Sequence, residues 1–293
     1  MTPTRTGLLL LIPLALFAAV ACTDASASPA ATAAVTTTTE VATTTTEAAT
    51  TTTAAPTTTE STTTTTAIPT TTLPANVEVV GPAIMPVTAV GKHNGTGTVV
   101  LQDRLTQLGF WTGASDGQYG FATTQAVMAY QKYVGLPAEG KVDQATADSL
   151  NVMTERGHGL SDTGTLVEVD KKRQLLFIVV EGKTVWTLNT STGSGRPYEA
   201  PNKNDPTKIE KGDAVTPNGL WKTTRERPDG WWEGDLGKIY RPKYFHGGIA
   251  IHGMTSVPNY PASHGCVRLS TQAMDFIWDN GLIPLGTPVW VHE

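Results

Sequence analysis

The chain has 293 residues and a formal net charge of −5 at neutral pH, with 39% hydrophobic and 16% charged residues. A length of this order accommodates one large domain or two small ones, and the uneven composition favours the second arrangement. Because there is no basic excess, we do not expect a nucleic-acid-binding protein. The two cysteines, Cys22 and Cys266, have very different surroundings, so they do not indicate a disulfide framework.

The N-terminus has the pattern of an export signal. Residues 8–21 are almost wholly apolar and follow Arg5, which predicts a signal peptide over residues 1–21, since the run is too short to span a membrane comfortably. The motif Ala19-Val20-Ala21-Cys22 is similar to a lipobox, in which Cys22 would carry the lipid anchor after cleavage. Ala19 stands where leucine is more usual, so simple secretion with cleavage after Ala21 or Ala27 stays open.

Residues 22–76 are dominated by Thr, Ala and Pro and show no apolar periodicity. They bury too little surface to offset chain entropy, so we predict a disordered tether whose composition is typical of O-glycosylated segments. A flexible coil of this length spans roughly 40 Å. The weakly alternating stretch at residues 76–92 fits an edge strand or an extended linker.

Three groups of apolar residues at helical spacing lie within residues 94–153. Glycines follow the first two groups, and Asp143 precedes the third as a helix cap. The groups are Leu101, Leu105 and Leu108; Val127, Tyr130 and Val134; and Ala147 and Leu150. We predict a small bundle of three short helices whose apolar faces meet in one core.

The same unit resembles the peptidoglycan-binding domain type 1. The resemblance is carried by Leu101-Gln102-x-x-Leu105-x-x-Leu108-Gly109, Asp116-Gly117-x-Tyr119-Gly120, Ala126-Val127-x-x-Tyr130-Gln131 and Gly135-Leu136-x-x-x-Gly140. It implies contacts with peptidoglycan glycan or stem peptide through exposed residues near the turns, such as Trp111, Asp116 and Tyr119. The alternative is that the apolar residues only form a core and the unit is a spacer.

Residues 163–292 are rich in short strand patterns. The pattern predicts a β-meander with tight turns, formed by strands at residues 165–169, 174–180 and 184–190. It also predicts a closing strand at residues 286–291. One helix follows Ser270, with Ala273, Phe276 and Ile277 as its buried stripe. We therefore predict a mainly β domain with one main helix. The polar segment 194–212 is too long for a simple hairpin loop, and fits a substrate-facing lid or an ordinary surface loop equally well.

The residues with the greatest catalytic potential lie close to Cys266 in the sequence. Ser263-His264-Gly265-Cys266-Val267-Arg268 follows the apolar run Ile249-Ala250-Ile251-His252, in which His252 lies on the face opposite the isoleucines. We expect Cys266 between a strand end and a helix start, where the helix N-terminus favours thiolate and an imidazole can take the proton. A single Cys or His is usually structural, but the combination indicates a catalytic pair.

Residues 165–291 resemble the L,D-transpeptidases, the YkuD-like cysteine enzymes of bacterial cell walls. Ser263 to Leu269 is the most specific part, and Thr216-Pro217-Asn218-Gly219 is similar to the family's Thr-Pro-x-Gly segment. The resemblance implies a sandwich-like β fold in which Cys266 is the nucleophile. It implies that His252 is the base, oriented by the carbonyl of Gly253 and, when protonated, favouring thiolate.

The resemblance also implies the reaction and its partners. A tetrapeptide stem acylates Cys266 and loses D-Ala, and an amine of a second stem accepts the acyl group to give a 3→3 crosslink in peptidoglycan. Backbone N–H groups near Gly265 and Cys266 would bind the oxyanion. Ser263 and His264 would shape the loop, and Arg268 would meet a stem carboxylate. Carbapenems are the expected inhibitors.

The reaction needs no cofactor, and we expect no metal, because His246, His252 and His264 lack a neighbouring carboxylate. We expect an extracytoplasmic protein of the cell envelope, with the membrane reached only through a lipid on Cys22. Two other functions stay open: an L,D-carboxypeptidase or cysteine hydrolase that uses water as acceptor, and a catalytically silent wall-binding protein. Acceptor choice depends on water exclusion at the second side of the cleft.

Overall fold

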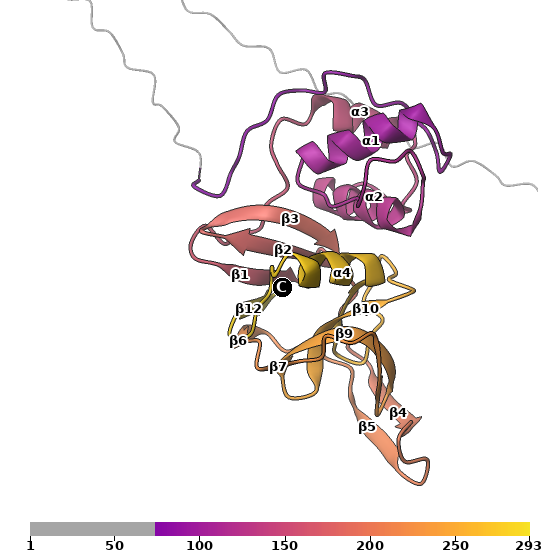
Figure 1. Ribbon diagram of the computed structural model, residues 1–293, viewed down its shortest axis with the longest axis vertical. Helices are drawn as coiled ribbons and strands as arrows, with labels where there is room; N and C mark the ends of the chain where they lie inside the picture. The colour runs from indigo at the N-terminus through magenta and orange to yellow at the C-terminus, as the bar shows by residue number, and fades with distance from the viewer. Residues whose placement is uncertain (1–73) are drawn as a thin grey trace, which may run out of the picture. The chain divides into compact units, whose positions relative to one another are not determined.

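The computed structural model describes residues 74–293 (Figure 1). The predicted signal peptide, Cys22 and the tether as far as residue 73 lie outside the described residues. Within residues 74–293, no helix has the length and apolar character needed to cross a bilayer.

The helical domain consists of α1 (Thr96–Gln107), α2 (Phe121–Val134) and α3 (Gln144–Val152), which confirms the predicted three-helix unit. The apolar stripes meet in one core, where Leu101, Tyr130 and Leu150 are fully buried. Gly135 ends α2 in the left-handed conformation, with φ of 77°. The Asp143 carboxylate caps α3 by accepting a bond from the amide of Thr146, at 2.8 Å.

Of the two structures considered for residues 76–92, the edge strand is absent and an extended segment is present. This segment has two isolated bridges, Val79 to Glu155 and Gly91 to Val142. Val87 is buried in the helical core, and its backbone exchanges two hydrogen bonds with the Asn151 side chain, at 2.8 and 3.0 Å. The segment is therefore part of the helical domain.

The β domain contains two five-stranded sheets, one small hairpin and one helix (Figure 1). The first sheet has the order β3-β2-β1-β12-β6, and the second has β11-β10-β9-β7 with β8 beside β9. The first sheet comprises β1 (Leu166–Asp170), β2 (Leu175–Val180), β3 (Lys183–Asn189), β6 (Gly219–Lys222) and β12 (Pro288–His292). The second comprises β7 (Arg225–Glu226), β8 (Trp231–Gly234), β9 (Gly237–His246), β10 (Ile249–Met254) and β11 (Val267–Ser270).

Strand β2 explains how the two domains share a core. Leu176 and Ile178 belong to the apolar cluster between the two sheets, whereas Leu175, Phe177 and Val179 belong to the cluster formed with the helical domain. Successive strand residues point to opposite faces, so both faces of β2 are covered. This is why its sequence is continuously apolar rather than alternating.

Backbone hydrogen bonds join the helical and β domains along one edge. The amide of Thr187 in β3 donates to the carbonyl of Gly109, and the amide of Gly157 donates to that of Leu108, both at 2.8 Å. The Arg156 side chain donates to carbonyls on both sides, at 2.8 Å to Gln107 and 3.0 Å to Val185. The segment after α3 is thus bonded to both domains.

Helix α4 (Thr271–Asp279) follows β11 and packs against β9, β10 and β11. Ser270 caps it as predicted, because its hydroxyl accepts from the amide of Ala273 at 3.1 Å. Ala273 and Ile277 are buried, but Phe276 is only half-buried and stacks on Trp111 of the helical domain, with ring centroids 5.1 Å apart.

Candidate active site

His252 lies in β10, with only 2% of its surface exposed. Its Nδ1 is 3.0 Å from the carbonyl oxygen of Gly253. A carbonyl can only accept, so Nδ1 carries the hydrogen and Nε2 is the nitrogen that can take up a proton. Gly253 has no room for a side chain, because a Cβ there would lie 3.0 Å from Cα of Thr271 and from Cδ1 of Tyr240. Packing therefore fixes the backbone that orients the imidazole.

Cys266 directly precedes β11, which pairs in parallel with β10. In that register Arg268 lies opposite His252 and Val267 opposite Ile251. Because side chains alternate between faces, Cys266 shares the face of His252 and Arg268. All three side chains line one cavity of about 600 Å³, here called the thiol cavity. A partly exposed thiol and an imidazole therefore open onto the same space.

The prediction of a helix immediately after Cys266 is wrong. Strand β11 intervenes, and α4 begins only at Thr271, beyond the far end of that strand. The field of a helix N-terminus falls off within a turn, so the dipole of α4 does not act on the thiol. Local hydrogen bonds position Cys266 instead.

The Ser263 hydroxyl donates to the carbonyl of Cys266 at 2.5 Å and accepts from the amide of Gly265 at 3.0 Å. Gly265 adopts φ of +130°, and a Cβ there would lie 2.9 Å from the carbonyl oxygen of Val215. Only glycine fits this position. Because the Gly265 amide already donates to Ser263, the oxyanion donor expected from Gly265 is occupied, which leaves the amide of Cys266 as the candidate.

Thr216 holds the same loop in place through hydrogen bonds. It was not among the site residues predicted from the sequence. Its buried hydroxyl donates to the carbonyl of Gly265 at 2.7 Å and accepts from the amide of Gly193 at 2.9 Å. The Thr-Pro-x-Gly segment was the sequence signal for it. This one side chain links the loop before Cys266 to the segment around Gly193.

Burial determines the charge states of the pair. It lowers the pKa of His252 to about 4, a shift that the bond to Gly253 opposes and the charge of Arg268 reinforces. Burial also raises the pKa of the Cys266 thiol, against the effects of the Ala250 backbone and Arg268. Both groups are therefore uncharged at neutral pH. The imidazolium–thiolate pair expected from the sequence is replaced by a neutral imidazole positioned to act as general base.

The hairpin of β4 (Pro197–Pro201) and β5 (Ile209–Asp213) occupies most of the polar segment that the sequence left open. Its Tyr198 lines the thiol cavity and packs edge-on against His264, with ring centroids 4.8 Å apart. The β8–β9 hairpin forms another wall through Trp232. The high density of aromatic residues at positions 231–245 is a sequence signal for this wall, whereas no motif indicates Tyr198.

Three guanidinium groups line the thiol cavity. Arg225 lies 4.0 Å from the ring centroid of Tyr244, and Arg227 lies 3.5 Å from that of Trp232. Within residues 74–293, the buried Nε atoms of Arg227 and Arg268 have no hydrogen-bond partner. Unsatisfied buried donors of this kind suit an anionic ligand. Carboxylates also line the cavity, on the hairpins: Glu210, Glu233 and Asp235.

The helical domain is hydrogen-bonded to the end of β3 and to the residue after it, which in turn is bonded to the strand that follows Cys266. The Lys132 ammonium of α2 donates to Asn189 at 2.5 Å and to the carbonyl of Thr190 at 3.2 Å. The Thr190 hydroxyl in turn donates to the carbonyl of Arg268 at 2.8 Å. The Gln125 side chain of α2 accepts from Asn189 at 2.6 Å and donates to the carbonyl of Val257 at 3.2 Å. Helix α2 is thereby bonded directly to the segment before the Ser-His-Gly-Cys motif, and through Thr190 to the strand after it.

The residues expected to contact peptidoglycan have three different environments. Asp116 is exposed, and its carboxylate accepts from the Gln118 amide at 2.9 Å and from Gln102 at 3.2 Å. Trp111 and Tyr119 were predicted to be exposed, but both side chains are half-buried. Trp111 stacks on Phe276, and Tyr119 packs against the helical core with its hydroxyl donated to the carbonyl of Gly140 at 3.1 Å.

Two sequence profiles match the chain. One is described as the L,D-transpeptidase catalytic domain (YkuD) and covers residues 164–291; the other is described as a putative peptidoglycan binding domain and covers residues 94–150. The crystal structure of the L,D-transpeptidase from Xylanimonas cellulosilytica is 40% identical, with a TM-score of 0.63, and the match covers 72% of this chain and 100% of that chain. The chain belongs to the L,D-transpeptidase family. The predicted family and the helical-then-β architecture are thereby confirmed.

Two further relatives of this L,D-transpeptidase family member share shorter segments with it. The N-acetylmuramoyl-L-alanine amidase CwlM of Mycobacterium tuberculosis is 42% identical over 65 residues, 22% of this chain and 16% of that protein. A spore cortex-lytic enzyme of Bacillus cereus is 33% identical over 72 residues, 25% of this chain and 28% of that protein. The chain thus spans less than a third of the length of either relative.

Proposed function

We propose that this chain is an exported cell-wall L,D-transpeptidase that forms 3→3 peptidoglycan crosslinks through an acyl-enzyme on Cys266. The observation that carries the proposal is the presence of Cys266 and His252 on one wall of the thiol cavity in a member of this family. The domain division belongs to the same proposal: residues 94–153 bind peptidoglycan, and residues 163–292 catalyse transfer.

In the first half-reaction, Sγ of Cys266 attacks the carbonyl carbon of the diamino acid in a tetrapeptide stem, and Nε2 of His252 accepts the thiol proton. The tetrahedral intermediate then collapses. Its amide bond breaks, and His252 returns the proton to the nitrogen of the departing D-Ala. The product is a thioester on Cys266. The amide of Cys266 is the donor that supports the oxyanion in this scheme.

In the second half-reaction, the amine of another stem attacks the thioester carbon and gives its proton to His252. The carbon–sulfur bond breaks, and the sulfur recovers a proton from the imidazole. The charges of the cavity support this use of two stems. Arg268 and Arg227 suit the carboxylate of the donor stem, and the carboxylates of the hairpins suit the approaching amine.

The decisive experiment incubates the purified protein with a disaccharide tetrapeptide and identifies the products by mass spectrometry. A crosslinked dimer together with free D-Ala supports transpeptidation. Tripeptide product alone means that water is the acceptor and the protein is an L,D-carboxypeptidase. No change means a catalytically silent wall-binding protein. The Cys266→Ala protein serves as the matched control, because it lacks the only thiol within residues 74–293.

Export and anchoring are part of the proposal and rest on the sequence pattern around Cys22. If a lipid on Cys22 anchors the protein, Cys22→Ala moves it from the membrane fraction to the soluble fraction. Membrane association that persists in this variant contradicts the lipoprotein proposal and leaves another retention mechanism.

Carbapenems are proposed to acylate the same thiol. Intact-protein mass spectrometry should show one added equivalent at Cys266, and His252→Ala should slow the addition about 100-fold, because a positioned base is lost. An adduct that maps outside residues 263–268, or equal labelling of the Cys266→Ala protein, contradicts the assignment of the nucleophile.

A further inference from the structure

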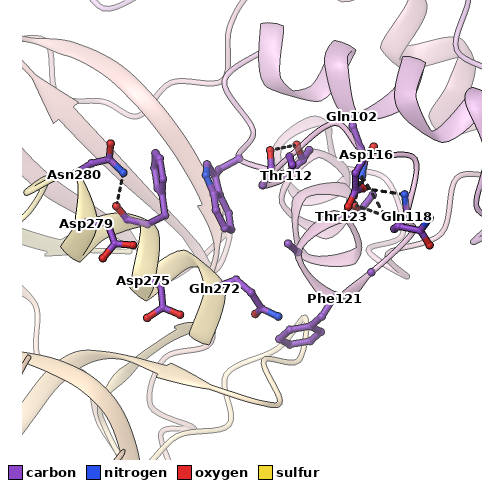
Figure 2. A pocket seen from close by; sticks show the side chains of 16 residues that line it. Gln102, Thr112, Asp116, Gln118, Phe121, Thr123, Gln272, Asp275, Asp279 and Asn280 are labelled. Carbon is purple, nitrogen blue, oxygen red and sulfur yellow. Dashed lines mark hydrogen bonds between the residues drawn. The ribbon is translucent and has the colours of Figure 1, made fainter. Parts of the chain in front are cut away.

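A second cavity, of about 560 Å³, lies between the helical domain and α4. It shares no lining residue with the thiol cavity and is here called the α4 cleft (Figure 2). One wall comes from the segments around α1 and the start of α2, and the other comes from α4. The two walls are held in place by the hydrogen bonds that join the two domains.

The α4 cleft has an aromatic part contributed by both domains. Trp111 of the helical domain stacks on Phe276 of α4, with an interplanar angle of 29°. In Figure 2, Gln272 of α4 points toward the ring of Phe121 at the start of α2. Half-buried aromatic rings beside polar side chains are typical of small-molecule sites. They offer apolar surface without closing the site to water.

Two carboxylates of the α4 cleft are fixed in place by neighbouring groups. Asp116 accepts from Gln102 at 3.2 Å. Asp275 accepts from the Tyr240 hydroxyl at 2.9 Å and from the guanidinium of Arg241 at 2.6 Å. Acceptors held in this way need little reordering when a ligand donates to them. Asp279 is exposed on the same wall, 3.6 Å from the same guanidinium.

Charge distinguishes the two cavities. The described residues that line the α4 cleft include carboxylates and amides but no Lys, Arg or His, with Arg241 as the nearby cation behind Asp275 and Asp279. An anionic stem peptide is therefore disfavoured there, whereas the thiol cavity presents three guanidinium groups. Hydroxyl and acetamido groups of an uncharged sugar donate to carboxylates and amides, and sugar rings present apolar faces to aromatic rings.

We propose that the α4 cleft binds the uncharged acetamido-sugar chain of peptidoglycan, with one wall supplied by α4. This inference deepens the proposed function and rests on it for the biological ligand. Cys266, β11 and α4 are continuous in the chain. A glycan held against α4 is thus attached to the same rigid segment that carries the nucleophile, while its stem peptide is left to the thiol cavity.

The test uses the Cys266→Ala full chain, in which turnover is absent, and N-acetylglucosamine tetramer as an uncharged probe. Binding is followed by calorimetry and by the indole N–H resonance of Trp111. We expect saturable binding that shifts this resonance, and we expect Gln272→Ala combined with Asp279→Asn to weaken binding at least tenfold. Asp162→Asn is the matched control, the same change at an exposed aspartate outside the cleft, and should bind like its parent.

Three results would overturn the proposal. The first would be no binding of the tetramer at millimolar concentration. The second would be unchanged binding by the protein that carries both Gln272→Ala and Asp279→Asn. The third would be displacement of the tetramer by a free tetrapeptide stem. Both substituted side chains are exposed, and circular dichroism verifies that the variant is folded. The transpeptidase proposal is tested in a separate experiment, in which mass spectrometry identifies the products formed by the wild-type protein. Loss of that activity with intact tetramer binding leaves the α4 cleft proposal standing.

Discussion

Replacing Thr216 by Val tests whether the hydroxyl beneath the Ser-His-Gly-Cys loop sets the geometry of the nucleophile. Valine has nearly the same shape, so the change removes two hydrogen bonds and little else. It leaves the buried carbonyl of Gly265 and the part-buried amide of Gly193 without their partner. Each unsatisfied buried group costs about 1–3 kcal/mol, so the two groups together should lower the free energy of unfolding by about 2–6 kcal/mol.

The effect on activity should exceed what partial unfolding explains. The carbonyl of Gly265 is directly adjacent to Cys266, and a shift of the loop would misplace both Sγ and the amide proposed as oxyanion donor. We expect D-Ala release to fall about 100-fold, as for small displacements of reacting groups. Urea denaturation gives the stability, and product analysis under folding conditions gives the rate. Thr216→Ser keeps the hydroxyl and should restore most of both; a Val protein as stable and active as the Ser protein would refute the reasoning.

Three further predictions use the same assays. Cys266→Ala should abolish D-Ala release with unchanged circular dichroism, and release at the original rate would exclude Cys266 as the nucleophile. Because burial lowers the pKa of His252 from 6.5 to about 4, the folded protein resists protonation there. Stability should therefore be highest above pH 6.5 and fall by up to about 3 kcal/mol between pH 6.5 and 4, and His252→Asn should flatten that slope in urea titrations. Gln125→Ala removes the Gln125 bonds to Asn189 and to the carbonyl of Val257 and leaves the Lys132 bonds in place. We expect kcat to fall about tenfold relative to the exposed α3 control Gln144→Ala, and equal kcat values would argue against a role of these bonds in positioning the loop.

Several features were predictable because they depend on neighbours in sequence. The three helices follow from apolar residues at helical spacing, and the Ser270 and Asp143 caps from local side-chain chemistry. The pairing of Cys266 with His252 was also predicted, because strand alternation specifies the face of His252 and the motif nominates the thiol. The helix expected after Cys266 was wrong, since four residues of a parallel strand do not differ in local pattern from the first turn of a helix.

What the sequence by itself determined is thus the family, the order of elements and the identity of the reactive side chains. The tertiary structure alone decided that the imidazole and the thiol are both neutral, because their pKa values depend on how thoroughly distant segments bury them. It also decided that the half-buried Trp111 ring stacks on Phe276, and that Tyr198 lines the thiol cavity. Such contacts join residues far apart in the chain, and they arise only when separate sheets and helices bury their apolar faces against one another.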